Sequence, residues 1–158
     1  MLTEIISAVF LSPIGPVRVE ASLRGIRSVA FCKGGEEGDL LHPWLRDGVR
    51  ELKEYFAGER KCFTSLALVM QGTDFQQAVW EAAMTIPYGE TVTYGELACS
   101  VGKKDAARAV GSALKVNPLL LIVPCHRVVP ARGGVGEYGA GSERKRWLLS
   151  LEQSSFVV

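Results

Sequence analysis

The sequence predicts two parts: an α/β N-terminal domain (a small β-sheet plus a helix) over residues 1–70, and a mostly α C-terminal domain containing a helix-turn-helix over residues 71–158. Two β-prone runs around a turn, followed by one amphipathic helical run, predict the first part. Two short helical runs joined by a glycine-containing turn predict the second. With 158 residues, 47% of them hydrophobic, the chain is long enough for one sizeable domain or two small ones.

In the first domain, the β-prone residues 17–21 and 26–31 flank a hairpin turn at residues 23–25. A helix opens after His42, which has no partner pattern and is interpreted as structural, and Gly58 is its expected C-cap. The apolar residues that recur at helical spacing in this helix are Trp44, Leu45, Val49, Leu52, Tyr55 and Phe56.

The second domain is predicted to begin and end with single helices. After a linker at residues 71–73, Asp74 is the expected N-cap of a helix that ends at the turn of residues 87–89. A glycine-rich loop at residues 130–141 precedes the last helix, which Ser142 is expected to cap. The residues expected on the buried faces are Phe75, Val79 and Ala82 or Ala83 in the first helix, and Trp147, Leu148 and Leu151 in the last.

Between these helices lies the predicted helix-turn-helix. A short helix over residues 96–101 is followed by a turn at residues 102–104. Asp105 is expected to cap the second helix, which runs to Val116 and is ended by Asn117 and Pro118, because a helix seldom continues through the residue before proline. The apolar residues 119–123 then predict a short buried strand.

Composition argues against several classes of protein. The N-terminal segment lacks a basic leader and carries Glu4, and no apolar run approaches the length of a membrane span, so neither a secretory signal nor a membrane protein is predicted. The four cysteines are scattered without a C-x-x-C pair, which indicates neither a zinc knuckle nor a disulfide framework. Free thiols fit a reducing compartment, so we expect a cytoplasmic protein, or a nuclear one in a eukaryote.

Positive charge gathers near the C-terminus, although the net charge of the chain is only +1. Residues 101–158 hold nine basic and four acidic side chains, whereas residues 74–100 hold four acidic and no basic ones. A local basic excess suits a polyanion such as DNA, and it also suits an ordinary solvated surface.

Cys125 is the strongest candidate for a reactive residue. It follows Pro124 and precedes His126 and Arg127, so an imidazole and a guanidinium adjoin the thiol. A thiolate is a strong nucleophile, and a neighbouring base or positive charge promotes its formation. The alternative is a packed core thiol, because free cysteine is among the most buried residue types.

The motif at residues 124–128 resembles the active-site motif of the O6-alkylguanine–DNA alkyltransferases. Residues 75–80 resemble the start of that family's DNA-binding half, and residues 86–98 resemble the turn and first helix of its helix-turn-helix. Residues 107–114 with Asn117 and Pro118 resemble its recognition helix and the turn after it. The match covers about residues 72–152, and it implies a protein that transfers alkyl groups from DNA irreversibly to its own cysteine.

The resemblance assigns five catalytic roles. Cys125 is the nucleophile, His126 its general base through a water molecule, and Glu152 the carboxylate that orients the histidine. Tyr94 aids rotation of the DNA backbone and hydrogen-bonds guanine N3, and Asn117 ties the recognition helix to the active-site turn. Taken alone, Glu152 would be read as a surface charge and Tyr94 as a residue packed at a helix N-terminus.

The second helix of the motif is almost bare of bulky side chains. Such a helix suits either tight helix packing or entry into the minor groove of DNA, which is only about 6 Å wide. Arg108, Ser112 and Lys115 share one face at spacings of four and three. By resemblance, Arg108 fills the gap left by a flipped nucleotide. The full set expected to contact DNA is Tyr94, Ala107, Arg108, Ser112, Lys115 and Arg127.

By resemblance, carbonyls near Cys125 and Val128 read the guanine amine, and Tyr138 lies in the loop that covers the alkyl group. Gly139 and Ala140 stand where the family has a small polar residue and a glycine, and Leu120 also varies. The range of alkyl groups accepted therefore stays open. The resemblance implies no metal or organic cofactor, and the cysteines and histidines form no convincing zinc set.

Three functions are weighed. The first is a single-use alkyltransferase acting as a monomer on double-stranded DNA that carries O6-alkylguanine, with O4-alkylthymine as a second substrate. The second is a non-catalytic sensor of alkylguanine, against which Cys125 argues because sensors resembling this family lack the cysteine. The third is a cysteine hydrolase with a Cys-His-Glu set, which leaves the helix-turn-helix unexplained.

Overall fold

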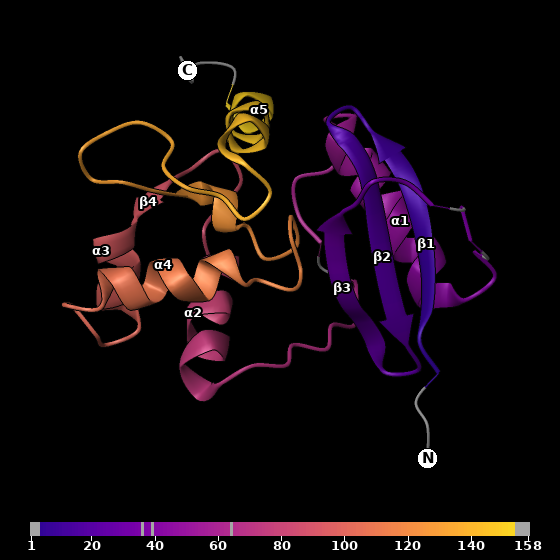
Figure 1. The fold of residues 1–158 in the computed structure, drawn as a ribbon, viewed down its shortest axis with the longest axis horizontal. Coiled ribbons are helices and arrows are strands. Elements are labelled where there is room, and N and C mark those ends of the chain that lie inside the picture. The colour runs from indigo at the N-terminus through magenta and orange to yellow at the C-terminus, as the bar shows by residue number, and fades with distance from the viewer. Residues whose placement is uncertain (1–3, 36, 39, 64, 154–158) are drawn as a thin grey trace. The chain divides into compact units, whose positions relative to one another are not determined.

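The computed structural model describes residues 4–35, 37–38, 40–63 and 65–153 (Figure 1). The chain folds as two compact units. We call Met1–Gln71 with Pro118–Ile122 the N-terminal unit, and Gly72–Asn117 with Val123–Val158 the C-terminal unit. No helix within the described residues has both the length and the apolar character needed to cross a bilayer.

The N-terminal unit is an antiparallel sheet with a helix packed on one face. Strands β1 (Ile6–Ser12), β2 (Gly15–Ser22) and β3 (Gly25–Phe31) lie in the order β1-β2-β3. Helix α1 (Pro43–Phe56) packs against all three strands through an apolar face that includes Leu45 and Leu52 (Figure 1). The structure adds β1 to the predicted hairpin and helix.

Local signals explain the limits of these elements. Ser22 pairs with Gly25 across the hairpin, and a side chain at Gly25 would collide with the carbonyl of Ala67. His42 caps α1 by accepting the Trp44 N–H at Nδ1 over 3.3 Å, which is a structural role. The C-cap of α1 is Ala57 rather than the predicted Gly58, which lies one residue further along with φ +77°.

The C-terminal unit is mostly helical. Its helices are α2 (Asp74–Met84), α3 (Tyr94–Ser100), α4 (Ala107–Lys115) and α5 (Ser142–Glu152). The short strands β4 (Val92–Thr93) and β5 (Val128–Val129) pair in parallel, and the 3-10 turn η1 (Cys125–Arg127) precedes β5. The helix-turn-helix is α3 and α4, and both pack against α2. The predicted fold class is therefore confirmed.

Three predicted N-caps are also wrong by one residue. Thr73, not Asp74, caps α2, because its extended backbone lets the hydroxyl accept the Gln76 N–H while the Gln76 side chain bonds back. Ala106, not Asp105, precedes α4, where no side chain forms a cap hydrogen bond. Gly141, whose φ is +98°, takes the position before α5, so Ser142 becomes its first residue.

Two further predictions need correction. The first helix of the motif begins at Tyr94 rather than residue 96, because Thr93 forms a capping box with Glu96. The predicted strand at residues 119–123 is not one, since Leu121 adopts φ 75° and the chain turns there. These residues are buried as expected. An apolar run shows that a segment is buried, but a short run does not fix its conformation.

Candidate active site

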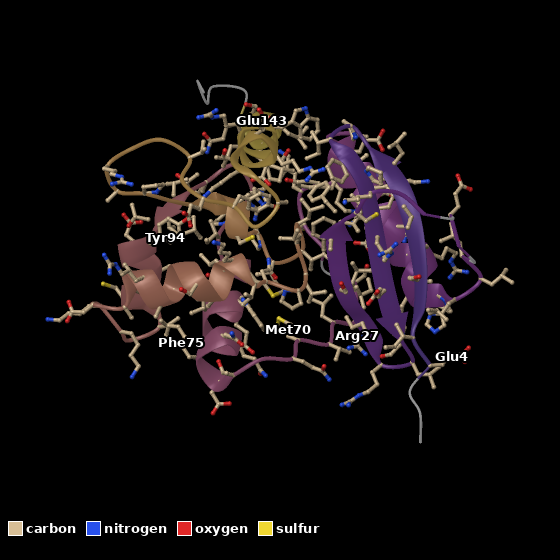
Figure 2. All side chains as sticks on the ribbon, viewed as in Figure 1. Glu4, Arg27, Met70, Phe75, Tyr94 and Glu143 are labelled. Atoms are coloured by element: carbon tan, nitrogen blue, oxygen red, sulfur yellow. The ribbon has the colours of Figure 1, made fainter. Side chains whose placement is uncertain are left out.

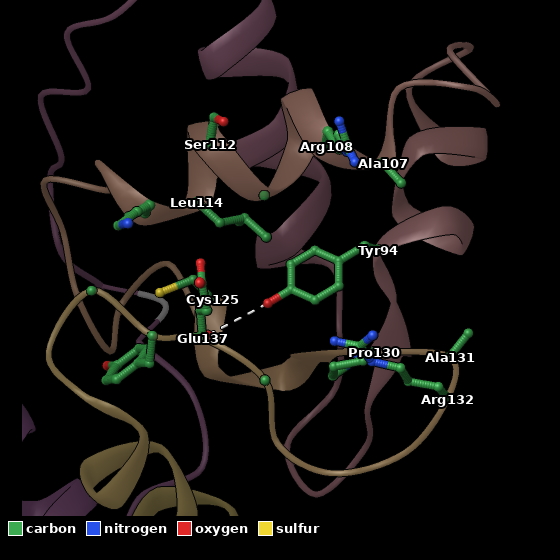
Figure 3. Close-up of a pocket in the computed structure, with 15 residues that line it drawn as sticks. Tyr94, Ala107, Arg108, Ser112, Leu114, Cys125, Pro130, Ala131, Arg132 and Glu137 are labelled. Carbon is green, nitrogen blue, oxygen red and sulfur yellow. Dashed lines mark hydrogen bonds between the residues drawn. The ribbon is translucent and has the colours of Figure 1, made fainter.

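An open cavity of about 980 Å³ lies in the C-terminal unit. Helix α4 forms one wall, Tyr94 at the start of α3 another, and the loop after β5 a third (Figure 3). The buried Cys125 also lines the cavity. The lining residues are Tyr94, Ala107, Arg108, Gly111, Ser112, Leu114, Lys115, Cys125, Pro130, Ala131, Arg132, Gly136, Glu137, Tyr138 and Gly139.

Cys125 is buried in η1, with only 4% of its surface exposed. Asn117 Nδ2 donates to its Sγ over 3.3 Å and to the Val123 carbonyl over 2.9 Å. This amide therefore ties the end of the recognition helix to the cysteine turn. Burial raises the pKa of the thiol to about 11, although the Asn117 hydrogen bond and the Lys145 charge act in the opposite direction. The resting residue is a thiol that needs a base.

Behind the cysteine, three buried charged or titratable side chains form a closed cluster. His126 Nε2 lies 2.6 Å from Glu152 Oε2. Arg127 donates to the same carboxylate through Nε over 2.8 Å and Nη2 over 3.1 Å, and its Nη1 donates to the Ile86 carbonyl over 2.7 Å. The adjacent residues His126 and Arg127 thus converge on a carboxylate from the end of α5.

The pKa values of this cluster fix its charge state. Burial raises the pKa of Glu152, but its hydrogen bonds and charge interactions with His126 and Arg127 outweigh burial and hold the pKa far below its usual range. Burial lowers the pKa of His126, against the opposing influence of Glu152. A cationic His126 would help to lower the pKa of Glu152, whereas the lowered pKa of His126 favours a neutral imidazole. Because Arg127 stays charged, we take ionised Glu152 beside neutral His126 as the resting state.

This charge state defines the chemistry available to His126. A neutral imidazole beside a carboxylate donates its Nε2–H to Glu152, which makes Nδ1 the basic nitrogen. When Nδ1 takes a proton, Glu152 stabilises the resulting imidazolium. Cysteine, histidine and carboxylate therefore have the order of groups found where a nucleophile is activated by an oriented base.

Lys145 is a site residue that the sequence prediction missed. It is fully buried in α5, and its Nζ donates to the carbonyls of Val128 (2.6 Å) and Glu137 (3.1 Å) and to Tyr94 Oη (3.5 Å). Burial lowers its pKa to about 8, with Cys125 opposing the shift. Helical spacing could have marked it as buried, but not as part of the site, because the buried residues of α5 are Lys145, Leu148, Leu149 and Glu152.

The expected DNA-contacting residues of α4 lie together on the cavity wall. Arg108, Ser112 and Lys115 are exposed, and Ala107 is half-buried beside them. Tyr94 lies at the start of α3 (Figure 2) and faces this wall across the cavity (Figure 3), and its hydroxyl donates to the Glu137 carbonyl over 3.5 Å. Burial raises the pKa of Tyr94, with Cys125 and Glu137 contributing, so it is a neutral donor.

Arg127 lies elsewhere: it is 6% exposed and bonded inside the cluster. Its contact with DNA stays a prediction.

The residues expected around the alkyl group are only partly together. Tyr138 and Gly139 line the cavity, whereas Val128, Ala140 and Leu120 are not among its described lining residues. The Val128 carbonyl accepts from Lys145, and the Ala140 carbonyl accepts from Arg144 over 3.2 Å. Leu120 is buried in the N-terminal unit. Among the described residues, no group of three histidine, cysteine, aspartate or glutamate side chains is placed to hold a metal.

A helix-turn-helix whose second helix borders a cavity lined by a cysteine, with a histidine bonded to a buried carboxylate next to it in the chain, defines a class: DNA-binding proteins with a candidate nucleophilic thiol. Family comparison agrees. The model of the 6-O-methylguanine DNA methyltransferase DNA-binding domain matches residues 74–154, and that of the family's ribonuclease-like domain matches residues 5–70. The chain therefore belongs to the 6-O-methylguanine DNA methyltransferase family.

Individual relatives cover nearly the whole chain. It is 44% identical over 153 residues to the methylated-DNA–protein-cysteine methyltransferase of Methanosarcina acetivorans, covering 93% of this chain and 97% of that protein. The crystal structure of the Mycobacterium tuberculosis O6-methylguanine methyltransferase matches with a TM-score of 0.85 and 40% identity, covering 98% and 96% of the two chains. That of Mycobacterium tuberculosis OGT in complex with DNA matches with a TM-score of 0.83 and 43% identity, covering 94% and 92%.

Proposed function

We propose that this protein repairs DNA by moving the alkyl group of O6-alkylguanine, and of O4-alkylthymine, onto Cys125, so that each molecule acts once. One observation carries the proposal: Cys125 lines a cavity bordered by α4, and His126, the next residue in the chain, contacts the buried carboxylate of Glu152. The names of the relatives support the same activity.

The alkylated base has to leave the duplex before Cys125 can reach it. Rotating a nucleotide out of the stack costs a few kcal/mol, and less when the base is damaged. Helix α4 enters the minor groove, where its small side chains permit close approach and Arg108 occupies the space left by the base.

Transfer then proceeds as an in-line displacement. His126 Nδ1 takes the Cys125 proton through a water molecule, and Glu152 stabilises the imidazolium. The thiolate forms a bond to the alkyl carbon while the bond from that carbon to guanine O6 breaks. The Tyr94 hydroxyl gives its proton to guanine N3 and is reprotonated by Lys145, so guanine leaves neutral. The thioether does not revert, and no cofactor takes part.

The remaining properties follow from this function. We place the protein in the cytoplasm, or the nucleus of a eukaryote, where a thiol stays reduced. It acts as a monomer on double-stranded DNA. Residues 1–70 form one domain, and residues 71–158 form the domain that binds DNA and accepts the alkyl group.

Intact-mass analysis after incubation with an O6-methylguanine duplex tests the proposal. We expect one added methyl group per protein, located on Cys125 by peptide mapping. Cys125→Ser should gain none and still bind the duplex, whereas the exposed Cys62 can be changed to serine without effect. A wild-type protein that binds alkylated DNA and gains no mass would instead be a sensor, and an adduct on Cys32, Cys62 or Cys99 would refute the assignment.

A further inference from the structure

The end of α5 is fastened to the turn between α2 and β4 by three hydrogen bonds. Tyr88 Oη donates to the Leu151 carbonyl over 3.3 Å, and the Gly89 N–H donates to Glu152 Oε1 over 3.2 Å. The Gln153 side-chain amide donates to the Gly89 carbonyl. We call this group of contacts the α5 clasp.

The α5 clasp matters because Glu152 lies at the very end of its helix. Glu152 is the last residue of α5, and the last carbonyls of a helix have no partners within it. A terminal turn held only by the helix would fray, and the carboxylate would move with it. The Tyr88 hydroxyl supplies one of the missing partners, since it binds the carbonyl of the residue just before Glu152.

Tyr88 also touches the other half of the buried cluster. The Arg127 guanidinium carbon lies 5.7 Å from the centroid of the Tyr88 ring, within range of a cation–π interaction. The ring therefore adjoins the arginine that binds Glu152, while the hydroxyl holds the helix end that carries Glu152. Phenylalanine at this position would keep the first contact and lose the second.

We propose that Tyr88 is a positioning residue for alkyl transfer: its hydroxyl holds the last turn of α5 so that Glu152 stays in contact with His126. The inference rests on the proposed function, in which Glu152 stabilises the imidazolium that forms when Cys125 loses its proton. Tyr88 touches neither the alkyl group nor the reacting sulfur and acts only through Glu152.

The effect expected of Tyr88 on His126 and Glu152 is one of position, because the charged groups around these two residues do not depend on it. Arg127 of η1 and Lys145 of α5 are the charged side chains that act on this pair. Tyr138, in the loop after β5, also interacts with Glu152. Tyr88→Phe changes none of these groups. Burial and Glu152 raise the pKa of Tyr88, so its hydroxyl remains a neutral donor across a neutral assay range.

The test is the pH dependence of single-turnover methyl transfer in wild type and Tyr88→Phe. Loss of one hydrogen bond should lower the rate at neutral pH by about three- to tenfold. The rise in rate should move to higher pH, because a looser Glu152 favours the imidazolium less and the thiolate forms later. The alkaline plateau should match that of wild type. Gln153→Leu, which cuts the clasp from the other side, should shift the profile in the same direction.

Tyr55→Phe is the matched control, since Tyr55 is a fully buried tyrosine of α1 in the N-terminal unit. Its hydroxyl loss should alter stability and leave the pH profile in place. A Tyr88→Phe protein with the wild-type profile, or with rates reduced equally at every pH, would overturn the proposal. Alkylation of Cys125 by iodoacetamide over the same pH range gives a reading without DNA, so the clasp is tested even if wild type transfers no methyl group.

Discussion

The two sides of Cys125 are built in opposite ways. On the inner side, His126, Arg127 and Glu152 are buried and bonded to one another. On the cavity side, Arg108 and Lys115 are exposed, and their side chains make no hydrogen bond or ion pair with other described residues. The inner groups are fixed before DNA arrives, whereas the outer ones are free to adapt to it.

This difference separates two kinds of free energy. Burying the inner charges has a large desolvation cost, which the folded protein has already met, so the groups need little rearrangement during the reaction. The outer side chains lose conformational freedom only when they bind DNA. Changes on the inner side should therefore affect the chemistry on every substrate. Changes on the outer side should affect only substrates that include a duplex.

The largest effect is expected for Glu152→Gln. The amide cannot stabilise an imidazolium as a carboxylate does, so methyl transfer should slow by about a hundredfold or more. It should slow equally for duplex DNA and for free O6-benzylguanine, because both need the same thiolate. The measurement is single-turnover transfer on the two substrates. A selective loss on duplex DNA would place Glu152 on the binding side of the comparison.

The same variant should change stability with pH. The pKa of Glu152 is lower in the folded protein than its ordinary value of 4.5. The unfolded chain therefore binds protons more readily, and this carboxylate's stabilisation is present above pH 4.5 and lost as pH falls below it. Neutral, buried His126 has its pKa lowered too, so it adds to the acid loss. As pH is lowered from neutral, the melting temperature of Glu152→Gln should therefore fall less steeply than that of wild type.

Sequence reasoning named all three residues of the inner side, Glu152 by resemblance, but it missed Lys145, which bonds to Tyr94 and to the Val128 carbonyl. Cys125, His126 and Arg127 are adjacent, so a local motif revealed them. Lys145 lies far along the chain, and it appears as a site residue only when the helical spacing of α5 is combined with the contacts of its ammonium group.

The misplaced elements have similar causes. The run at residues 119–123 was predicted as a strand because apolar residues signal burial in any conformation, and the positive φ of Leu121 has no signature in its side chain. The helix caps shifted by one residue because neighbouring polar residues, such as Thr73 and Asp74, can both serve as caps. The extended backbone conformation at Thr73 decides that this residue, and not Asp74, forms the cap.

Alkylation of Cys125, which lies between the two sides, should lower the stability of the folded protein. Cys125 is only 4% exposed, and its Sγ already lies 3.3 Å from Asn117 Nδ2. A methyl group on this sulfur therefore adds volume to a packed region. Added volume in a tight core costs about 1–3 kcal/mol. The melting temperature should fall by about 2–8 °C after reaction, measured once the DNA is removed. Cys125→Ser treated in the same way should not change, and an alkylated protein of equal or higher melting temperature would contradict the expectation.

Arg108→Ala addresses the outer side. Repair of duplex DNA should slow by about tenfold, since the void left by the flipped base, which costs a few kcal/mol to open, is no longer filled. Reaction with free O6-benzylguanine should be nearly unchanged, because no base is flipped. Arg146→Ala is the matched control, as Arg146 is an exposed arginine on α5 that does not line the cavity. Equal losses on both substrates would give Arg108 a structural role.

The smallest effect is expected at Ala140. The adjacent Gly139 lines the cavity so close to the end of α4 that an added Cβ would lie 3.0 Å from the Lys115 carbonyl. One methylene in a tight pocket changes discrimination by about tenfold or more. Ala140 lies beside the lining, so Ala140→Gly should raise the ratio of benzyl to methyl transfer by a smaller factor, about threefold. Ala131→Gly, on the cavity-lining part of the same loop, controls for added flexibility. A rise in both variants would assign the effect to loop motion, and an unchanged ratio would remove Ala140 from the alkyl pocket.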